Sequence, residues 1–137
     1  MDVISDTSFL FALASVKERF HQDCVKVARQ VNGRIVVPTT ILPEIAYLLM
    51  ARRGHHVMRS FIQELQRPTW DVTSLEVADL GRVSDLLEAY QDAELDFADA
   101  TIVAIAERLN IGIVLTLDRR HFRMIRPKHT DYFTVLP

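Results

Sequence analysis

Short apolar runs alternate along the chain with longer stretches in which apolar residues recur every three or four positions. The short runs are β-branched and flanked by polar or turn residues, which predicts strands at residues 3–4, 35–37, 70–72, 113–115 and 132–135. The longer stretches predict helices at residues 9–16, 20–31, 41–50, 57–65, 75–90 and 97–109. This alternation is typical of an α/β layered fold, so we expect a mostly parallel five-stranded sheet flanked by helices.

Glycine, asparagine and proline mark the expected helix ends. Asn and Gly in the segment 110–112 end the sixth helix, and Gly54 separates two helices. Pro43 is compatible with a helix that begins near residues 39–40, because the first N–H groups of a helix have no intrahelical partner. Glu44 is then expected in the first or second turn of that helix.

Length and composition describe an ordinary folded domain. The chain has 137 residues, which suits one domain of about 100 to 150 residues, and we expect residues 1–137 to form a single domain. Hydrophobic residues make up 49% and charged residues 25%, so the chain can bury a core and is not intrinsically disordered. The net charge of −2 means that any binding of nucleic acid must come from a local patch.

Cysteine usage and hydropathy favour a cytoplasmic protein that does not associate with a membrane. The single Cys24 cannot form an intramolecular disulfide, and its helical spacing places it in the core. The apolar run at residues 9–14 follows Asp2 and Asp6 with no Lys or Arg, unlike a signal peptide. No apolar stretch reaches the roughly 18 residues that cross a bilayer.

Acidic residues fall where strands give way to helices. Asp6 directly follows the first strand, Asp118 follows the fourth, and Glu44 opens the helix after the second. Asp96 and Asp99 open the sixth helix. In a parallel sheet these junctions share the carboxyl edge, where ligands gather, so we expect the five carboxylates to face one edge.

Several carboxylates at one edge repel one another unless a cation compensates them. The hard, oxygen-seeking ions Mg²⁺ and Mn²⁺ tolerate such a set. Mg²⁺ keeps several waters, one of which can be activated to attack a phosphodiester. Metal-dependent phosphodiester hydrolysis is therefore the expected reaction.

Each acid taken alone also has a structural interpretation. Asp96 is suited to cap the sixth helix with Asp99 in a capping-box position, Asp6 also suits a cap, and Asp118 suits a turn. The set favours a functional site, because nearly every strand-to-helix junction offers an acid. Glu44 adds to this, since it stands among apolar residues, where an unpaired charge is costly.

The motifs around these acids resemble the PIN-domain ribonucleases, and the length resembles the single-domain VapC toxins of toxin–antitoxin pairs. The resemblance runs from Met1 to near the C-terminus in the right order and spacing. It is carried by four segments: Ile4-Ser5-Asp6-Thr7-Ser8-Phe9-Leu10, Pro43-Glu44-Ile45, Leu95-Asp96-Phe97-Ala98-Asp99-Ala100, and Leu115-Thr116-Leu117-Asp118 with His121-Phe122.

The resemblance implies a set of site residues and an activity. The family's metal-binding and catalytic acids correspond to Asp6, Glu44, Asp99 and Asp118, with Asp96 as an accompanying metal-site acid and Thr116 as a supporting hydroxyl. The implied fold is a three-layer PIN-like fold, and the implied activity is Mg²⁺- or Mn²⁺-dependent endonucleolytic cleavage of structured RNA. The implied partners are a small cognate antitoxin and a second copy of the chain in a homodimer.

Basic residues are concentrated directly after Asp118. Residues 119–129 contain no acid, and we expect RNA phosphates to dock on their basic side chains, above all on Arg119, Arg120 and Arg123. A second basic set surrounds Gly54: Arg52, Arg53, His55, His56 and Arg59. The alternative for both sets is an ordinary solvated surface with cations at helix ends.

Three other functions remain open from the residues alone. A haloacid-dehalogenase-like phosphatase would use Asp6 as a nucleophile, but that chemistry normally wants an acid where this chain has Ser8. A receiver-type signalling module needs a lysine at the end of a late strand, where Thr116 and Asp118 stand. A non-catalytic binding module would use the acids only as helix caps. Metal-dependent RNA cleavage that is lost on Asp6→Asn separates a ribonuclease from all three.

Overall fold

Five parallel strands form one sheet at the centre of the computed structural model, which describes residues 1–137. The strands are β1 (Val3–Ser5), β2 (Ile35–Pro38), β3 (Trp70–Thr73), β4 (Ile113–Leu115) and β5 (Thr134–Leu136). Their order across the sheet is β3-β2-β1-β4-β5, and every neighbouring pair is parallel. The α/β prediction is confirmed, although the last strand lies slightly later than the apolar run at residues 132–135.

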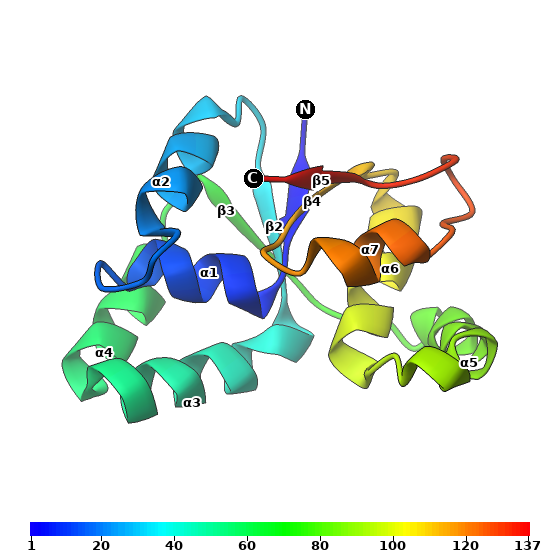
Figure 1. Cartoon of the computed structure of the whole chain (residues 1–137), viewed down its shortest axis with the longest axis horizontal. Coiled ribbons are helices and arrows are strands. Elements are labelled where there is room, and N and C mark those ends of the chain that lie inside the picture. Colours follow the sequence, from blue (N-terminus) through cyan, green and yellow to red (C-terminus); the bar gives the residue numbers. More distant parts are fainter.

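Seven α-helices cover the two faces of the sheet, which gives three layers (Figure 1). On one side lie α1 (Thr7–Ala14), α2 (His21–Gln30), α3 (Leu42–Arg53) and α4 (His55–Glu64). On the other side lie α5 (Asp79–Ala89), α6 (Phe97–Leu109) and α7 (Arg119–Met124). Two 3₁₀ turns, Thr39–Ile41 and Gln91–Ala93, precede α3 and α6. None of the helices combines the length and apolar character that crossing a membrane needs.

The strand order reverses direction at β1, which fixes where a site can form. The chain proceeds from β1 through β2 to β3 on one side, then crosses back to place β4 and β5 on the other. Ser5 is paired with Leu115, so β1 and β4 end side by side, and the Asp6 N–H donates to the Leu115 carbonyl at 3.1 Å. Side chains that follow these two strands therefore meet at the switch point of the sheet.

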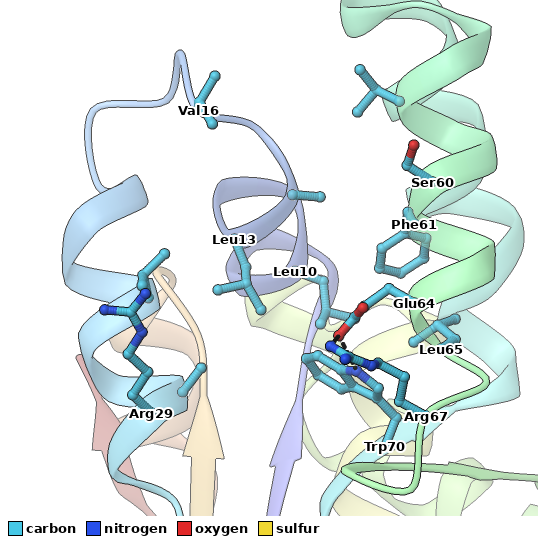
Figure 2. Close-up of a pocket in the computed structure, with 14 residues that line it drawn as sticks. Leu10, Leu13, Val16, Arg29, Ser60, Phe61, Glu64, Leu65, Arg67 and Trp70 are labelled. Atoms are coloured by element: carbon cyan, nitrogen blue, oxygen red, sulfur yellow. Dashed lines mark hydrogen bonds and ion pairs between the residues drawn. The ribbon is translucent and has the colours of Figure 1, made fainter.

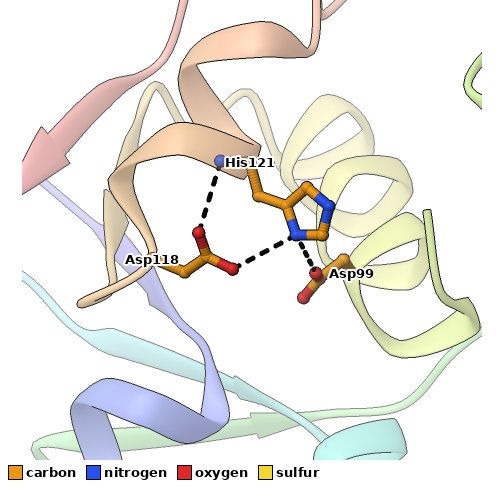
Figure 3. Close-up of side chains that lie close together, drawn as sticks. All are labelled: Asp99, Asp118 and His121. Carbon is orange, nitrogen blue, oxygen red and sulfur yellow. Dashed lines mark hydrogen bonds and ion pairs between the residues drawn. The ribbon is translucent and has the colours of Figure 1, made fainter. Parts of the chain in front are cut away.

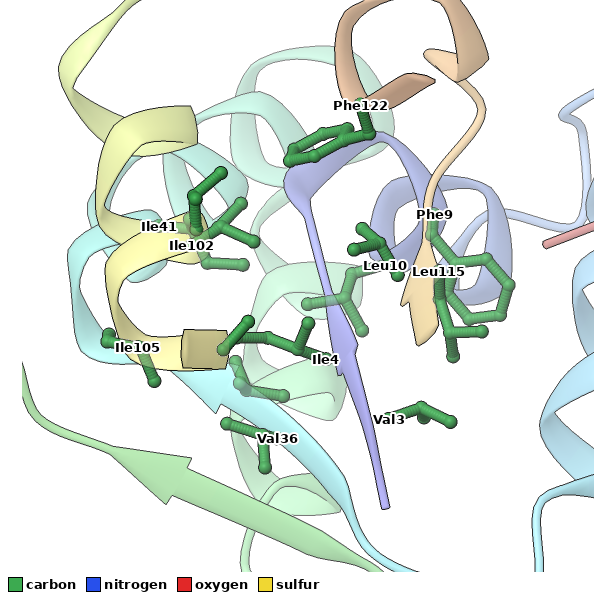
Figure 4. Close-up of a cluster of buried hydrophobic side chains, with 14 of the residues drawn as sticks. Val3, Ile4, Phe9, Leu10, Val36, Ile41, Ile102, Ile105, Leu115 and Phe122 are labelled. Atoms are coloured by element: carbon green, nitrogen blue, oxygen red, sulfur yellow. The ribbon is translucent and has the colours of Figure 1, made fainter. Parts of the chain in front are cut away.

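The core lies between the sheet and its helices. Ile4 of β1 and Leu115 of β4 are fully buried, together with Phe9 of α1, Ile102 of α6 and Phe122 of α7 (Figure 4). Residues 100–106 of α6 are buried all round because α6 lies against β1 and β2 and is covered by α5. The expectation that Cys24 packs in the core is confirmed, since it is fully buried.

A glycine with positive φ separates α3 from α4. Gly54 has φ 105°, a conformation that residues with a Cβ rarely adopt, and its N–H donates to the carbonyls of Leu49 and Met50. The predicted break at Gly54 is confirmed. The predicted helix start near residues 39–40 is also confirmed in outline, because a 3₁₀ turn over Thr39–Ile41 leads directly into α3.

Candidate active site

Three of the predicted acids cap helices that begin at the same edge of the sheet. Asp6 accepts from the Phe9 N–H at 3.0 Å and begins α1. Asp96 accepts from the Asp99 N–H at 2.8 Å and begins α6. Asp118 accepts from the N–H three positions later at 3.4 Å and begins α7. The capping interpretation is confirmed for Asp6 and Asp96, whereas Asp118, interpreted as a turn acid, caps a helix as well. Each cap holds its carboxylate at a helix N-terminus, where the helix dipole favours negative charge.

Asp6 is the most enclosed of these acids, and both of its oxygens are held. Ser8 Oγ and the Phe9 N–H donate to Oδ1, at 2.8 Å and 3.0 Å, and Thr116 Oγ1 donates to Oδ2. Burial raises the pKa of Asp6, while the three hydrogen bonds counteract that rise. The carboxylate therefore has a fixed orientation.

Two hydroxyl groups tie the ends of β1 and β4 together around Asp6. Thr116 Oγ1 accepts from the Asp118 N–H at 2.8 Å, and Ser8 Oγ accepts from the Leu117 N–H at 2.9 Å. Thr116 is fully buried, and its contact with Asp6 agrees with the supporting role that the resemblance implies. Ser8 was not predicted to have such a role.

Asp99 and Asp118 converge on one imidazole nitrogen. His121 Nδ1 lies 3.2 Å from Asp99 Oδ2 and 3.2 Å from Asp118 Oδ2, as Figure 3 shows. Burial first, and then the negative charges of Asp96, Asp6 and Asp118, raise the pKa of Asp99 to about 7, and His121 partly opposes this rise. The four aspartates therefore form one electrostatically coupled cluster.

His121 stands in one of the motif segments, but no role in the site was predicted for it. It stands three positions after Asp118, and this Asp-x-x-His spacing places two side chains on one face only if the segment is helical. The helix that supplies this geometry, α7, has six residues and was not predicted.

Glu44 lies in the first turn of α3, as predicted, but its expected apolar surroundings are wrong. The side chain is exposed, because α3 buries Ile45 and Leu49 and turns Glu44 to solvent. The carboxylates that raise the pKa of Asp99 do not include Glu44. Its assignment as a metal-binding and catalytic acid stays a prediction.

The basic residues predicted to bind RNA directly follow the capping acid Asp118 in the chain. Arg119, Arg120 and Arg123 are exposed on α7, the helix that Asp118 caps. In the second basic set, Arg53 has a structural role instead, since it lies over the Phe11 ring and forms a 2.7 Å ion pair with Glu18.

The donor set suits a hard divalent cation. The cluster offers carboxylate oxygens from Asp6, Asp96, Asp99 and Asp118, and one imidazole nitrogen. Ligand atoms of Asp99, Asp118 and His121 all lie within 4.8 Å of one another. Carboxylate oxygens are the ligands that Mg²⁺ and Mn²⁺ prefer, and their mutual repulsion here is relieved by a cation. The residues present therefore fit such an ion.

A separate apolar groove lies between α1, α2 and α4, away from the aspartate cluster. It has a volume of about 700 Å³ and is formed by α1, α2, α4 and the start of β3 (Figure 2). Leu10, Leu13, Phe61 and Leu65 line it, and Trp70 closes one end with its indole N–H donated to Glu64 at 3.3 Å. The groove holds none of the clustered aspartates.

Comparison with known proteins gives one family. The sequence pattern of the PIN domain matches residues 3–126. Ribonuclease VapC26 of Mycobacterium tuberculosis is 31% identical over 135 residues, which cover 98% of this chain and all of that protein.

Solved structures with the same fold are more distant in sequence. The M. tuberculosis toxin VapC20, described as cleaving the sarcin-ricin loop, superposes with a TM-score of 0.76 at 20% identity over 82% of this chain and 86% of that one. VapBC2 from Rickettsia felis, bound to a promoter DNA fragment, superposes with a TM-score of 0.71 at 14% identity, and the match covers 98% of this chain and 97% of that one. A toxin–antitoxin complex from Klebsiella pneumoniae superposes with a TM-score of 0.69 at 17% identity, and the match covers 96% of this chain and 98% of that one.

Proposed function

Because the chain belongs to the PIN-domain family and is of the VapC type, we propose that it is a metal-dependent endoribonuclease that acts as the toxin of a toxin–antitoxin pair. The observation that carries this proposal is the aspartate cluster at the switch point of the sheet, in which burial and neighbouring charges raise the pKa of Asp99 to about 7. Such a cluster is costly unless a cation binds it.

The chain's own residues prepare this cluster for a divalent ion. Ser8 and Thr116 orient the Asp6 carboxylate, while Asp99 and Asp118 face it from the N-terminal turns of α6 and α7. We propose Asp6, Asp99 and Asp118 as the metal-binding and catalytic acids, with Asp96 accompanying them. When bound, Mg²⁺ or Mn²⁺ would supply positive charge and an acidic water for phosphodiester hydrolysis. Because the pKa of Asp99 is about 7, its carboxyl would have to be deprotonated to hold such an ion, so metal affinity would fall below that pH.

Structured RNA is the proposed substrate, and α7 is its proposed docking surface. Arg119 and Arg120 follow Asp118 directly on α7, which supports a phosphate-binding surface beside the carboxylates, and the Arg119 guanidinium also donates to the Pro137 carbonyl. Contacts to phosphates position a nucleic acid without reading its sequence.

A small cognate antitoxin and a second copy of the chain are the proposed protein partners. The structural relatives include toxin–antitoxin complexes from Rickettsia felis and Klebsiella pneumoniae, which supports an antitoxin partner. A cytoplasmic location and the extent of the single domain over residues 1–137 stay predictions.

The decisive experiment measures RNA cleavage and metal binding by the same variant. Asp99→Asn keeps the size of the side chain, so we expect the fold to survive while Mn²⁺ affinity falls and cleavage of a structured RNA is lost. The matched control is Asp92→Asn, which changes an exposed acid on the 3₁₀ turn before α6 and should cleave like the parent. Cleavage by Asp99→Asn at the parent's rate contradicts the proposed function.

The same assay tests the docking surface and the alternative chemistry. Replacing Arg119 and Arg120 by alanine should leave Mn²⁺ affinity unchanged but weaken RNA binding and flatten its dependence on salt. A phosphatase would instead form an acyl phosphate on Asp6, which base and hydroxylamine cleave, so phosphate transfer to this side chain from a small phosphate ester would favour that alternative.

A further inference from the structure

The imidazole of His121 is placed where a cation between the carboxylates would be bound. Its Nδ1 faces Asp99 and Asp118 at equal distances of 3.2 Å, and the ring is 27% exposed (Figure 3). Asp99 belongs to α6 and Asp118 to the start of α7, so the ring bridges two elements that are distant in the chain.

These spacings match the edges of a coordination shell. Adjacent ligands of an octahedral ion, each at about 2.1 Å from the ion, lie about 3 Å apart. The Nδ1 atom is 3.2 Å from each carboxylate oxygen, so all three atoms can contact one ion with small adjustments.

The helix α7 fixes the ring in this position. The neighbouring side chain of Phe122 is fully buried, and it packs edge-on against Phe133 at 6.5 Å between ring centroids. Asp118 caps the same helix, so Asp118 and His121 occupy one turn and project to the same side.

We propose that His121 is a nitrogen ligand of the metal site and gives the site a preference for a transition-metal ion such as Mn²⁺ over Mg²⁺. This inference rests on the proposed metal dependence and extends it to the choice of ion. Imidazole nitrogen binds first-row transition metals well, whereas Mg²⁺ strongly prefers oxygen ligands and keeps its waters. A site built from carboxylates alone has only oxygen ligands, which suit both ions, so its ligands do not favour Mn²⁺ over Mg²⁺ in this way.

Pulsed electron paramagnetic resonance on the Mn²⁺-loaded protein tests the nitrogen ligand directly. We expect the parent to show hyperfine coupling from a directly bound nitrogen, and His121→Asn to lose it. The control is His55→Asn, which changes an exposed histidine at the start of α4 and should keep the coupling. His121→Gln serves as a second variant, and circular dichroism establishes that each variant is folded.

Calorimetric titration with each metal alone tests the preference. Loss of His121 should weaken Mn²⁺ binding by about tenfold or more, and Mg²⁺ binding by less than about threefold. Tighter Mn²⁺ binding by the variants would overturn the inference, because His121 would then be a competing positive charge and not a ligand. A nitrogen coupling that is absent from the parent, or that persists in both folded variants, would also overturn it.

The inference and the proposed function fail in different ways. If the parent binds Mn²⁺ with nitrogen coupling but does not cleave RNA, the proposed function is wrong and the ligand assignment stands. If the parent cleaves RNA with Mn²⁺ but shows no nitrogen coupling, only the ligand assignment is wrong. If the parent binds neither metal, both are wrong.

Discussion

At the scale of single residues, Asp99 makes the metal-free protein sensitive to pH. Its pKa is about 7 in the folded protein and near the ordinary 3.8 in the unfolded chain. Between these values the folded state binds more protons than the unfolded state, so the free energy of unfolding falls as pH rises. Near pH 8 the ionised carboxylate costs roughly 4 kcal/mol, since each unit of pKa corresponds to about 1.4 kcal/mol.

We therefore expect Asp99→Asn to stabilise the metal-free protein by up to about 4 kcal/mol near pH 8 and to change it little near pH 4. Urea unfolding in the presence of a chelator, repeated across this pH range, measures the difference. Asp92→Asn should follow the parent at every pH. A variant whose advantage is the same at both ends of the range would show that Asp99 is not the titrating group.

We expect the hydroxyl of Thr116 to contribute to stability, because it both donates to Asp6 and accepts from the Asp118 N–H. Thr116→Val keeps the shape but leaves two buried polar groups without this partner, which should lower the free energy of unfolding by about 1–3 kcal/mol. Thr116→Ser should restore most of the loss. Equal stability of the valine variant and the parent, measured by denaturant unfolding, would refute this role.

Residue chemistry explains which site residues could be predicted. Asp6, Asp99 and Asp118 were found because each follows a strand or opens a helix, and parallel strands bring such positions to one edge. Ser8 and His121 were not, because a hydroxyl or an imidazole has a role here only through contacts with residues far away in the sequence. The apolar neighbours of Glu44 in the sequence suggested burial, but the 3.6-residue period of α3 turns its side chain to solvent.

At the scale of elements, Asp96 has two opposing effects at the start of α6: its side chain caps the helix, and its negative charge repels that of Asp99. Asp96→Ala removes the bond to the Asp99 N–H and should destabilise the metal-free protein by about 1 kcal/mol. Asp96→Asn can keep that bond while removing a charge that repels Asp99, so it should be at least as stable as the parent. Thermal unfolding of the three proteins gives the order. An asparagine variant as unstable as the alanine variant would mean that the cap is not what Asp96 contributes.

Element boundaries were predictable where the pattern was long and marked by a breaker. Helix α6 was predicted at its observed position because 13 residues carry a continuous apolar pattern that Asn110 ends in a left-handed conformation. Helix α7 has six residues, too few to establish a helical period, and its arginines look like a surface loop. Its capping acid, Asp118, was recognised for a different role.

At the scale of the whole molecule, an exposed apolar stripe on α3 carries the prediction of a homodimer. Tyr47 and Met50 are 63% and 43% exposed, and their spacing places them on one face. Tyr47→Arg should convert a dimer into a monomer, as measured by light scattering at high micromolar concentration. Val77→Arg changes an exposed apolar residue near α5 and should leave the assembly unchanged. A parent that is monomeric under these conditions contradicts the prediction.

The bond between Asp6 and Thr116 joins residues 110 positions apart, and this separation governs when the site can exist during synthesis. In a nascent chain Asp6 is synthesised long before Thr116, Asp118 and His121 have been added. Contacts between such distant positions form late, since the loop between them must first close. A chain that ends before β4 therefore lacks the hydroxyl that holds Asp6 and the Asp118 and His121 side of the cluster, so the complete cluster forms only after nearly the whole chain has been synthesised.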